Sequence, residues 1–188
     1  DHLWVLSRPR TVKPADAAKA APPVMVFDQS GKFLKSWGGD GAGYEWPQRE
    51  HGILIDGKGS VWIGGNNCIG RSLPGLKNIG DDQLLKFTQD GQFLLQVGKA
   101  SGNKGNADTA SFRQPADASY YAKTNEIFVA DGYGNHRVIV IDADSGAFKR
   151  MWGAYGNKPV DSAPCPPATL KSVPAGDGPQ QFSIVHSI

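Results

Sequence analysis

The chain has 188 residues, a formal net charge of +2, and high glycine and proline contents of 24 and 13 residues. This length is enough for one domain with a buried core, and the many glycines and prolines favour tight turns over long helices. The net charge is small and the sequence has no run of basic residues, so it lacks the charge pattern that is typical of nucleic-acid-binding proteins. No apolar stretch approaches the roughly 20 residues that are needed to cross a bilayer.

In chain order, the first strong pattern is a hairpin that occurs again further along. Val24–Gly38 aligns without a gap on Leu84–Gly98, 60 residues later, and with one extra turn residue on Val138–Gly153. Apolar runs separated by such glycine turns are typical of antiparallel strands. The positions shared by the first two segments are Phe27 with Phe87, Gly31 with Gly91, Phe33 with Phe93, and Gly38 with Gly98.

Further strands precede each hairpin. A second-strand run comes before it in every unit, at Leu3–Val5, Val61–Ile63 and Ile127–Val129. Two units also have a first strand, and each of these follows an aromatic residue and a proline. A hairpin repeat alone also occurs in solenoids and sandwiches, but four-stranded units are the blades of a β-propeller. The first strands are Gly52–Asp56 and Ala116–Tyr121, preceded by Tyr44–Pro47 and Phe112–Pro115, and Gln181–Val185 begins a third such unit.

We therefore expect an all-β chain in which residues 1–188 form a single propeller domain. The blade portions are residues 1–43, 44–111, 112–158 and 181–188, with insertions at 66–82, 99–109 and 157–180. This amounts to about three to four blades, fewer than most propellers have, so we expect a segment of a larger ring with uncovered apolar sheet faces. Pro14–Ala21 has some helical tendency, but its composition favours a surface loop.

Propeller topology predicts where polar side chains gather. The first strand of a blade starts from one face of the ring and the second strand returns to it. His51 and His186 precede first strands, whereas Arg8, Asn66 and Tyr133 lie at or just past the ends of second strands. We expect all five at a single mouth.

Two imidazoles from different blades are suited to a metal site, and a catalytic zinc takes three protein ligands and keeps one position open. For each of these residues an ordinary structural role is the alternative to a role in a site. Histidines at strand starts can be polar residues in a wet channel, Tyr133 can cover a blade edge, and Arg8 can pair with a carboxylate at the rim. Residue spacing alone leaves these alternatives open.

The chain has two cysteines, Cys68 and Cys165, which lie 97 positions apart in loop-like sequence. They can pair in an oxidising compartment or remain free thiols, and the sequence does not choose between these two states.

The order of aromatic–proline signal, strand, Asp-Gly turn and strand resembles NHL repeats, which build six-bladed propellers. Within that group the chain is most similar to peptidyl-α-hydroxyglycine α-amidating lyases and their bacterial relatives. The most specific part is the DGYGNHR sequence. The likeness is carried by EIFVADGYGNHRVIVID, EHGILIDGKGSVWIGG, FRQPADASYY, GAFKRMWGAYG and QQFSIVHSI, and more weakly by LWVLSRPR.

The resemblance implies specific site residues. It implies that His51 and His186 are zinc ligands, that Tyr133 is a catalytic tyrosine and that Arg8 is the arginine that binds substrate. The third zinc histidine is expected beyond residue 188. Two positions depart from the family pattern: Gly134 stands where the animal enzymes have a cysteine, and Ser7 stands where a histidine usually precedes the arginine.

The function we expect is zinc-dependent cleavage of an α-hydroxyglycine-type carbinolamide, the second step of peptide amidation, with Asn66 as a further substrate-binding residue. The cofactor is zinc, with a structural calcium ion as a second candidate, and the substrate is a small molecule or a peptide. We expect an extracellular or periplasmic location. Two rivals are a non-catalytic NHL module that binds a protein or peptide, and a calcium-dependent propeller lactonase, for which Asn66 and Asn67 give the only hint.

Overall fold

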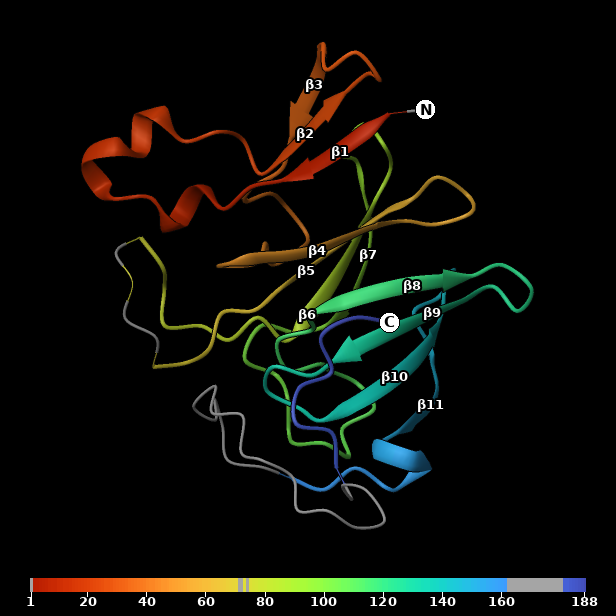
Figure 1. The fold of residues 1–188 in the computed structure, drawn as a ribbon. Helices are drawn as coiled ribbons and strands as arrows, with labels where there is room; N and C mark the ends of the chain where they lie inside the picture. The colour runs from red at the N-terminus through yellow and green to blue at the C-terminus, as the bar shows by residue number, and fades with distance from the viewer. Residues whose placement is uncertain (1, 71–72, 74, 162–180) are drawn as a thin grey trace.

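A computed structural model describes residues 2–70, 73, 75–161 and 181–188. Within these residues the chain folds into three antiparallel sheets and has almost no helix (Figure 1). The part of the structure described here contains no helix that is both long and apolar enough to span a membrane. The all-β expectation is therefore confirmed.

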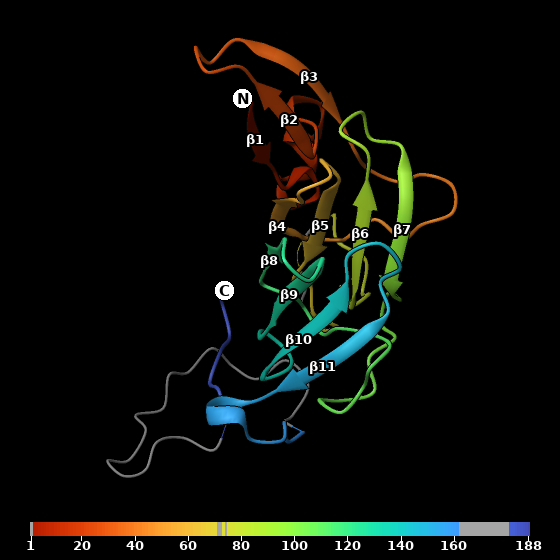
Figure 2. The same ribbon diagram turned by 90° about the vertical axis from the view of Figure 1, so that its right-hand side faces the viewer.

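Each sheet is built from strands in chain order. The first has three strands, in the order β1-β2-β3, and the second and third have four each, β4 to β7 and β8 to β11. Figure 2 shows the sheets stacked in an arc, with β1, β4 and β8 along one side and β3, β7 and β11 along the other. The strands are β1 (Leu3–Leu6), β2 (Val24–Phe27), β3 (Phe33–Trp37), β4 (Glu50–Ile55), β5 (Val61–Gly65), β6 (Gln83–Phe87), β7 (Phe93–Gly98), β8 (Asp117–Tyr121), β9 (Glu126–Asp131), β10 (Arg137–Asp142) and β11 (Phe148–Trp152).

The hairpin repeat is reproduced in the register of the strands. Val24 pairs with Trp37, and Leu84 pairs with Val97 at the equivalent place. All three outer hairpins shift register one residue before their last pair, which are Phe27 with Phe33, Phe87 with Phe93, and Ile141 with Phe148. The same side-chain pattern therefore builds the same hairpin each time. The three stacked antiparallel sheets fit a partial propeller.

The core lies between the sheets. One apolar cluster, centred on Ile63, Leu85 and Phe87, joins the first sheet to the second. Another, which includes Trp62, Ile127 and Ile139, joins the second sheet to the third. Burying side chains of this size contributes roughly 1.5–3 kcal/mol each. Stacking therefore supplies much of the stability of each sheet.

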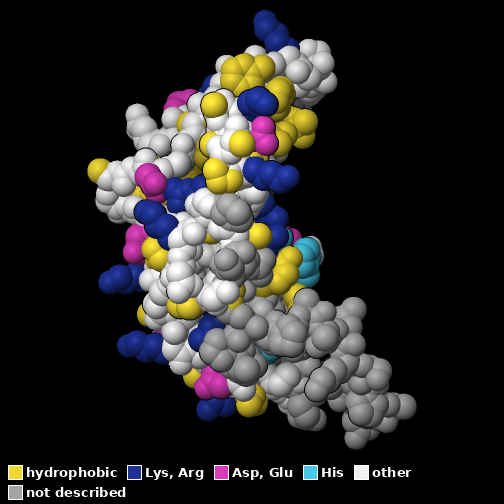
Figure 3. Space-filling model, turned by 90° about the vertical axis from the view of Figure 1, so that its left-hand side faces the viewer, with side chains coloured by type: hydrophobic (Ala, Val, Ile, Leu, Met, Phe, Trp, Pro, Cys, Tyr) yellow, Lys and Arg dark blue, Asp and Glu magenta, His cyan; other side chains and the backbone are white. Residues whose placement is uncertain are grey.

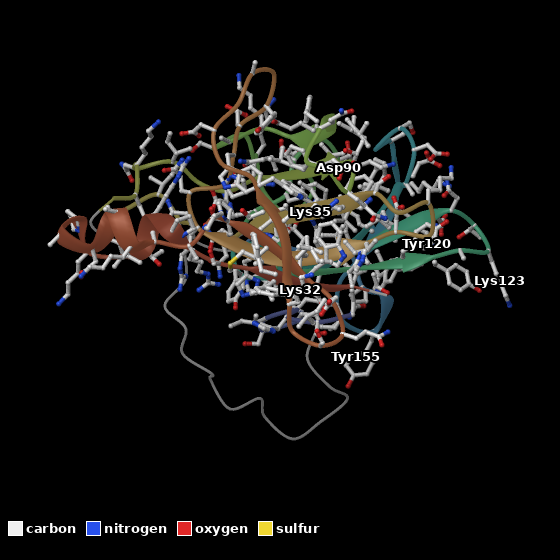
Figure 4. All side chains as sticks on the ribbon, turned by 90° about the horizontal axis from the view of Figure 1, so that it is seen from above. Lys32, Lys35, Asp90, Tyr120, Lys123 and Tyr155 are labelled. Atoms are coloured by element: carbon white, nitrogen blue, oxygen red, sulfur yellow. The ribbon has the colours of Figure 1, made fainter. Side chains whose placement is uncertain are left out.

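Contacts outside these two apolar clusters join the sheets as well. Lys35 on β3 and Asp90 in the β6–β7 turn lie beside one another in Figure 4, and their charged atoms are 2.5 Å apart. Tyr120, also labelled there, packs its ring over Gly57 in the β4–β5 turn.

Two segments differ from the sequence-based expectation. Pro14–Lys19 forms a 3-10 helix where a loop was expected, and Pro14 favours this because its ring fixes φ near the helical value. Residues 181–188 were expected to begin a first strand, but they form no strand in the part of the chain that is described. A strand needs a hydrogen-bonded neighbour, and the described residues supply none at that place.

Candidate active site

The mouth end of the sheets, defined as the end where β4 begins and β5 and β9 finish, holds the predicted residues. His51 is the second residue of β4, and a register shift lies between His51 and Ile53. Gly52 occupies that shift with φ of +76°, a conformation that side chains with a Cβ rarely adopt. Because such a bulge re-aims neighbouring side chains, Gly52 helps to set the direction of His51.

A hydrogen bond at one ring nitrogen, Nδ1, holds the ring of His51 in place. Its Nδ1 lies 2.7 Å from the carbonyl oxygen of Ala116, which can only accept, so Nδ1 carries the proton. Burial lowers the pKa of His51, which favours the neutral ring, and with the proton on Nδ1 the lone pair lies on Nε2. A backbone carbonyl that fixes the tautomer in this way is what metal-binding histidines commonly have.

Tyr133 brings the two histidines together. Its hydroxyl oxygen lies 3.1 Å from His51 Nε2 and 2.6 Å from His186 Nε2. The three rings stand roughly edge to face, with centroids 5.2 to 5.5 Å apart. Figure 3 shows histidine atoms reaching the surface beside hydrophobic side chains. Three residues that are distant in sequence, His51, Tyr133 and His186, therefore form one cluster.

Arg8 lies next to this cluster. Its Nε donates a hydrogen bond of 2.7 Å to the carbonyl oxygen of Glu50, which links the first sheet to β4 of the second. The Glu50 side chain is buried and accepts a bond from the Trp46 indole, while burial raises its pKa. An open hollow of about 450 Å³ lies beside these residues. It is lined by Leu6, Arg8, Glu50, His51, Gly52 and Ile53.

Asn66 follows β5 at the same end but is placed differently. It is 3% exposed, and its backbone N–H bonds to the Arg49 carbonyl. Among the described residues its side-chain oxygen has no hydrogen-bond partner, and no contact joins it to the histidines or to Tyr133. The structure thus brings four of the five predicted residues together and leaves Asn66 apart from them. Cys68, close by in sequence, is disulfide-bonded, and Cys165 lies outside the described residues.

A buried ion pair behind Tyr133 was not recognised in the sequence. Arg137 and Asp131 are both fully buried, and the guanidinium Nε lies 2.8 Å from the Asp131 carboxylate. The same carboxylate accepts bonds from Asn135 Nδ2 and from the backbone N–H of Arg113. In the sequence, Asp131 stands at the end of a strand and directly before a glycine, a position that is typical of a turn residue. The spacing D-G-Y-G-N-H-R, with an arginine at the start of an apolar strand, was the available signal.

The cluster was also considered as a zinc site. Nε2 of each of the two imidazoles lies within hydrogen-bond distance of the same phenol oxygen, and imidazole is a normal zinc ligand, so the donor chemistry fits. In the described part of the chain, no group of three or more His, Cys, Asp or Glu side chains is placed to hold a metal ion. A zinc ion here would need at least one further ligand, and the metal assignment of His51 and His186 stays a prediction.

Comparison with known proteins gives distant relatives. The chain is 27% identical over 175 residues to NHL repeat-containing protein 3 of Mus musculus, covering 89% of this chain and 39% of that protein. It is 26% identical over 141 residues to peptidylglycine alpha-amidating monooxygenase of Rattus norvegicus, covering 73% of this chain and 11% of that protein. No family model matches.

The match to a third relative covers fewer residues of this chain. Over 95 residues the chain is 32% identical to the Caenorhabditis elegans protein named "Probable peptidyl-alpha-hydroxyglycine alpha-amidating lyase pgal-1", covering 50% of this chain and 22% of that protein. The chain therefore spans less than two fifths of the length of each of these relatives.

The stacked sheets and the mouth cluster define a partial β-propeller with a polar site at one end. The similarity to these relatives, at 26% to 32% identity, supports an NHL-type repeat for this propeller.

Proposed function

We propose that the chain is part of a zinc-dependent, lyase-like propeller that cleaves an α-hydroxyglycine-type carbinolamide. The observation that carries this proposal is that one phenol oxygen, that of Tyr133, lies within hydrogen-bond distance of Nε2 on both His51 and His186. Support also comes from relatives whose names describe peptide amidation.

The two histidines would hold zinc through Nε2. His51 is prepared for this because its Nδ1–H is already bonded to the Ala116 carbonyl, which leaves Nε2 free. A bound zinc ion supplies Lewis-acid polarisation of a substrate oxygen. A third ligand must come from outside the described residues.

Tyr133 would act as the general base. Its phenol oxygen is at the centre of the cluster, where in the phenolate form it would take the proton of the carbinolamide hydroxyl. As that O–H bond breaks, the carbon–oxygen double bond of the aldehyde product forms. The C–N bond then breaks, and the departing amide nitrogen takes up the proton that Tyr133 accepted, which returns Tyr133 to the phenolate form. The products are an amide and a glyoxylate-type aldehyde.

Arg8 would anchor the substrate. Its Nε is fixed on the Glu50 carbonyl, so the guanidinium is held beside the same hollow as His51. A guanidinium binds a carboxylate and stabilises developing negative charge. Leu6 and Ile53 line the hollow with apolar surface, which suits the acyl part of a substrate.

We further propose an extracellular or periplasmic location, because disulfides such as that of Cys68 persist in oxidising compartments. Asn66 remains a proposed substrate contact only if its buried amide becomes accessible when substrate binds.

The test is zinc content and glyoxylate release by the full-length protein on an N-acyl-α-hydroxyglycine. We expect bound zinc and stoichiometric glyoxylate. Protein without zinc that binds a peptide without turnover would favour the binding module instead. Calcium in place of zinc, with lactone hydrolysis, would favour the lactonase.

A further inference from the structure

The cluster depends on two close approaches of backbone to backbone. Gly132 lies between Asp131 and Tyr133, and the backbone of Val185 packs directly against it. A Cβ placed on Gly132 would overlap the nitrogen, carbonyl carbon and oxygen of Val185. Its φ lies outside the left-handed region, so the constraint at this position is space alone. Since Val185 precedes His186, this contact sets how near His186 comes to Tyr133.

Gly52 provides the second approach. Besides its φ of +76°, a Cβ at this position would lie 3.0 Å from the Ala116 carbonyl oxygen. That oxygen is the one that accepts the Nδ1–H of His51. A side chain at position 52 would therefore both strain the bulge and press on the atom that fixes the His51 ring.

We propose that Gly132 and Gly52 are positioning residues, Gly132 for the Tyr133–His186 contact and Gly52 for the orientation of His51. The geometric part of this inference stands by itself. Its consequence for zinc rests on the proposed function.

The structure indicates which partner would move if Gly132 gained a side chain. The Tyr133 side of the contact is held by the buried Asp131 carboxylate and its bond to Arg137. Residues 181–188 pack Val185 and Phe182 against the third sheet, and their side chains are otherwise held by exposed hydrogen bonds, such as the one from Ser187 Oγ to Asp117 Oδ2 at 2.9 Å. The His186 segment is therefore the side that yields, and His186 moves away from Tyr133.

The experiment uses the full-length protein with Gly132→Ala and Gly52→Ala, each with a matched control. Gly57→Ala is the control for Gly132→Ala. A Cβ at position 57 also meets a crowded site, the Tyr120 ring at 2.5 Å, but at the opposite end of β4. Gly31→Ala is the control for Gly52→Ala. Gly31 has the same kind of positive φ, +84°, but a Cβ at this position would have no atom within 4 Å. Zinc affinity is measured by calorimetry. In the zinc-free protein, NMR measures contacts between the His186 and Tyr133 rings and the tautomer of His51.

Gly132→Ala is expected to abolish the ring contacts between His186 and Tyr133, and Gly52→Ala to remove the fixed Nδ1–H tautomer of His51. Each is expected to weaken zinc binding about 10- to 100-fold, the usual effect of disturbing groups that orient metal ligands. The two controls keep the wild-type NMR signals and zinc affinity.

Wild-type ring contacts and tautomer in both glycine variants would overturn the inference and leave the proposed function intact. If the wild-type protein binds no zinc, the proposed function fails, and the zinc-free NMR measurements still decide the inference. If Gly132→Ala does not fold, the Gly52→Ala arm decides.

Discussion

The two ends of the sheets differ in how far their polar and charged side chains are buried. At the mouth end, charged and amide side chains are buried, such as Asp131, Arg137 and Glu50. At the opposite end, where β4 turns into β5 and β6 into β7, the pair of Lys86 with Asp56 is also buried, but other ion pairs are exposed. Lys58 and Asp144 are each more than half exposed, and Asp90 is 78% exposed.

This difference has an energetic meaning. A buried charge costs free energy unless every partner is in place, so it stabilises one arrangement and penalises all others. An exposed pair contributes little and tolerates change. The mouth end is therefore the part of the molecule whose geometry is fixed most strictly, as a site built from separate segments requires.

The largest expected effect is at the mouth end itself. In the full-length protein, His51→Ala removes an imidazole whose Nε2 points at the centre of the cluster. We expect zinc and activity to be lost together, measured by metal analysis and glyoxylate release. His2→Ala is the control, since His2 lies at the exposed start of the chain. Retention of both zinc and activity by the His51 variant would show that the site lies elsewhere.

Breaking the buried ion pair should cost stability. Arg137→Met leaves the fully buried Asp131 carboxylate without its charged partner. We expect the free energy of unfolding to fall by about 3–5 kcal/mol, the usual result of removing one partner of a buried pair. Urea unfolding followed by fluorescence measures it. A loss below about 1 kcal/mol would mean that the pair is not buried in solution.

The opposite end should respond to acid. Bonds from Arg150 lower the pKa of Glu126 to about 2, and the backbone N–H of Ser145 lowers that of Asp142 to about 2. Because both pKa values are depressed in the folded state, this stability is present above the ordinary carboxyl range and is lost as pH falls toward 2. Unfolding free energies between pH 5 and pH 2 should therefore fall.

Glu126→Gln provides the comparison for that measurement. This variant should show a flatter decline over the same pH range, because it has no carboxylate to protonate at that position. A decline as steep as that of the wild type would assign the acid sensitivity to other groups.

The smallest effect is expected for the exposed pair between the first two sheets. Asp90→Asn removes the partner of Lys35 at the surface. The free energy of unfolding should change by less than about 1 kcal/mol and less still in high salt. A change comparable to that of Arg137→Met would remove the distinction between the two ends.

Much of the fold could be predicted from the sequence, because each hairpin repeats the same side chains. Phe27, Phe87 and Ile141 all pair at the equivalent place that their shared pattern gives them, although the register shift beside each of them was not predicted. The grouping of His51 with Tyr133 followed from topology, since strand starts and strand ends meet at one mouth, whereas His186 joins them without a strand in the described residues. Their chemical roles stay predictions.

Other features could not be predicted because they depend on contacts between distant residues. Nothing near His51 in sequence indicates that Ala116, 65 positions later, fixes its ring. Asp131 looks like any turn residue until its burial against Arg137 is known. Asn66 was expected at the mouth, but burial separates its side chain from the cluster.

The most direct test of the central claim compares two tyrosines. Tyr133→Phe removes the hydroxyl that lies between the two histidines, whereas Tyr155→Phe alters a side chain that is 77% exposed and points outward in Figure 4. Zinc content and glyoxylate release are measured on the same samples. We expect Tyr133→Phe to keep its zinc and lose turnover by about 10²- to 10⁴-fold, and Tyr155→Phe to match the wild type. Full turnover by zinc-loaded Tyr133→Phe would contradict the account.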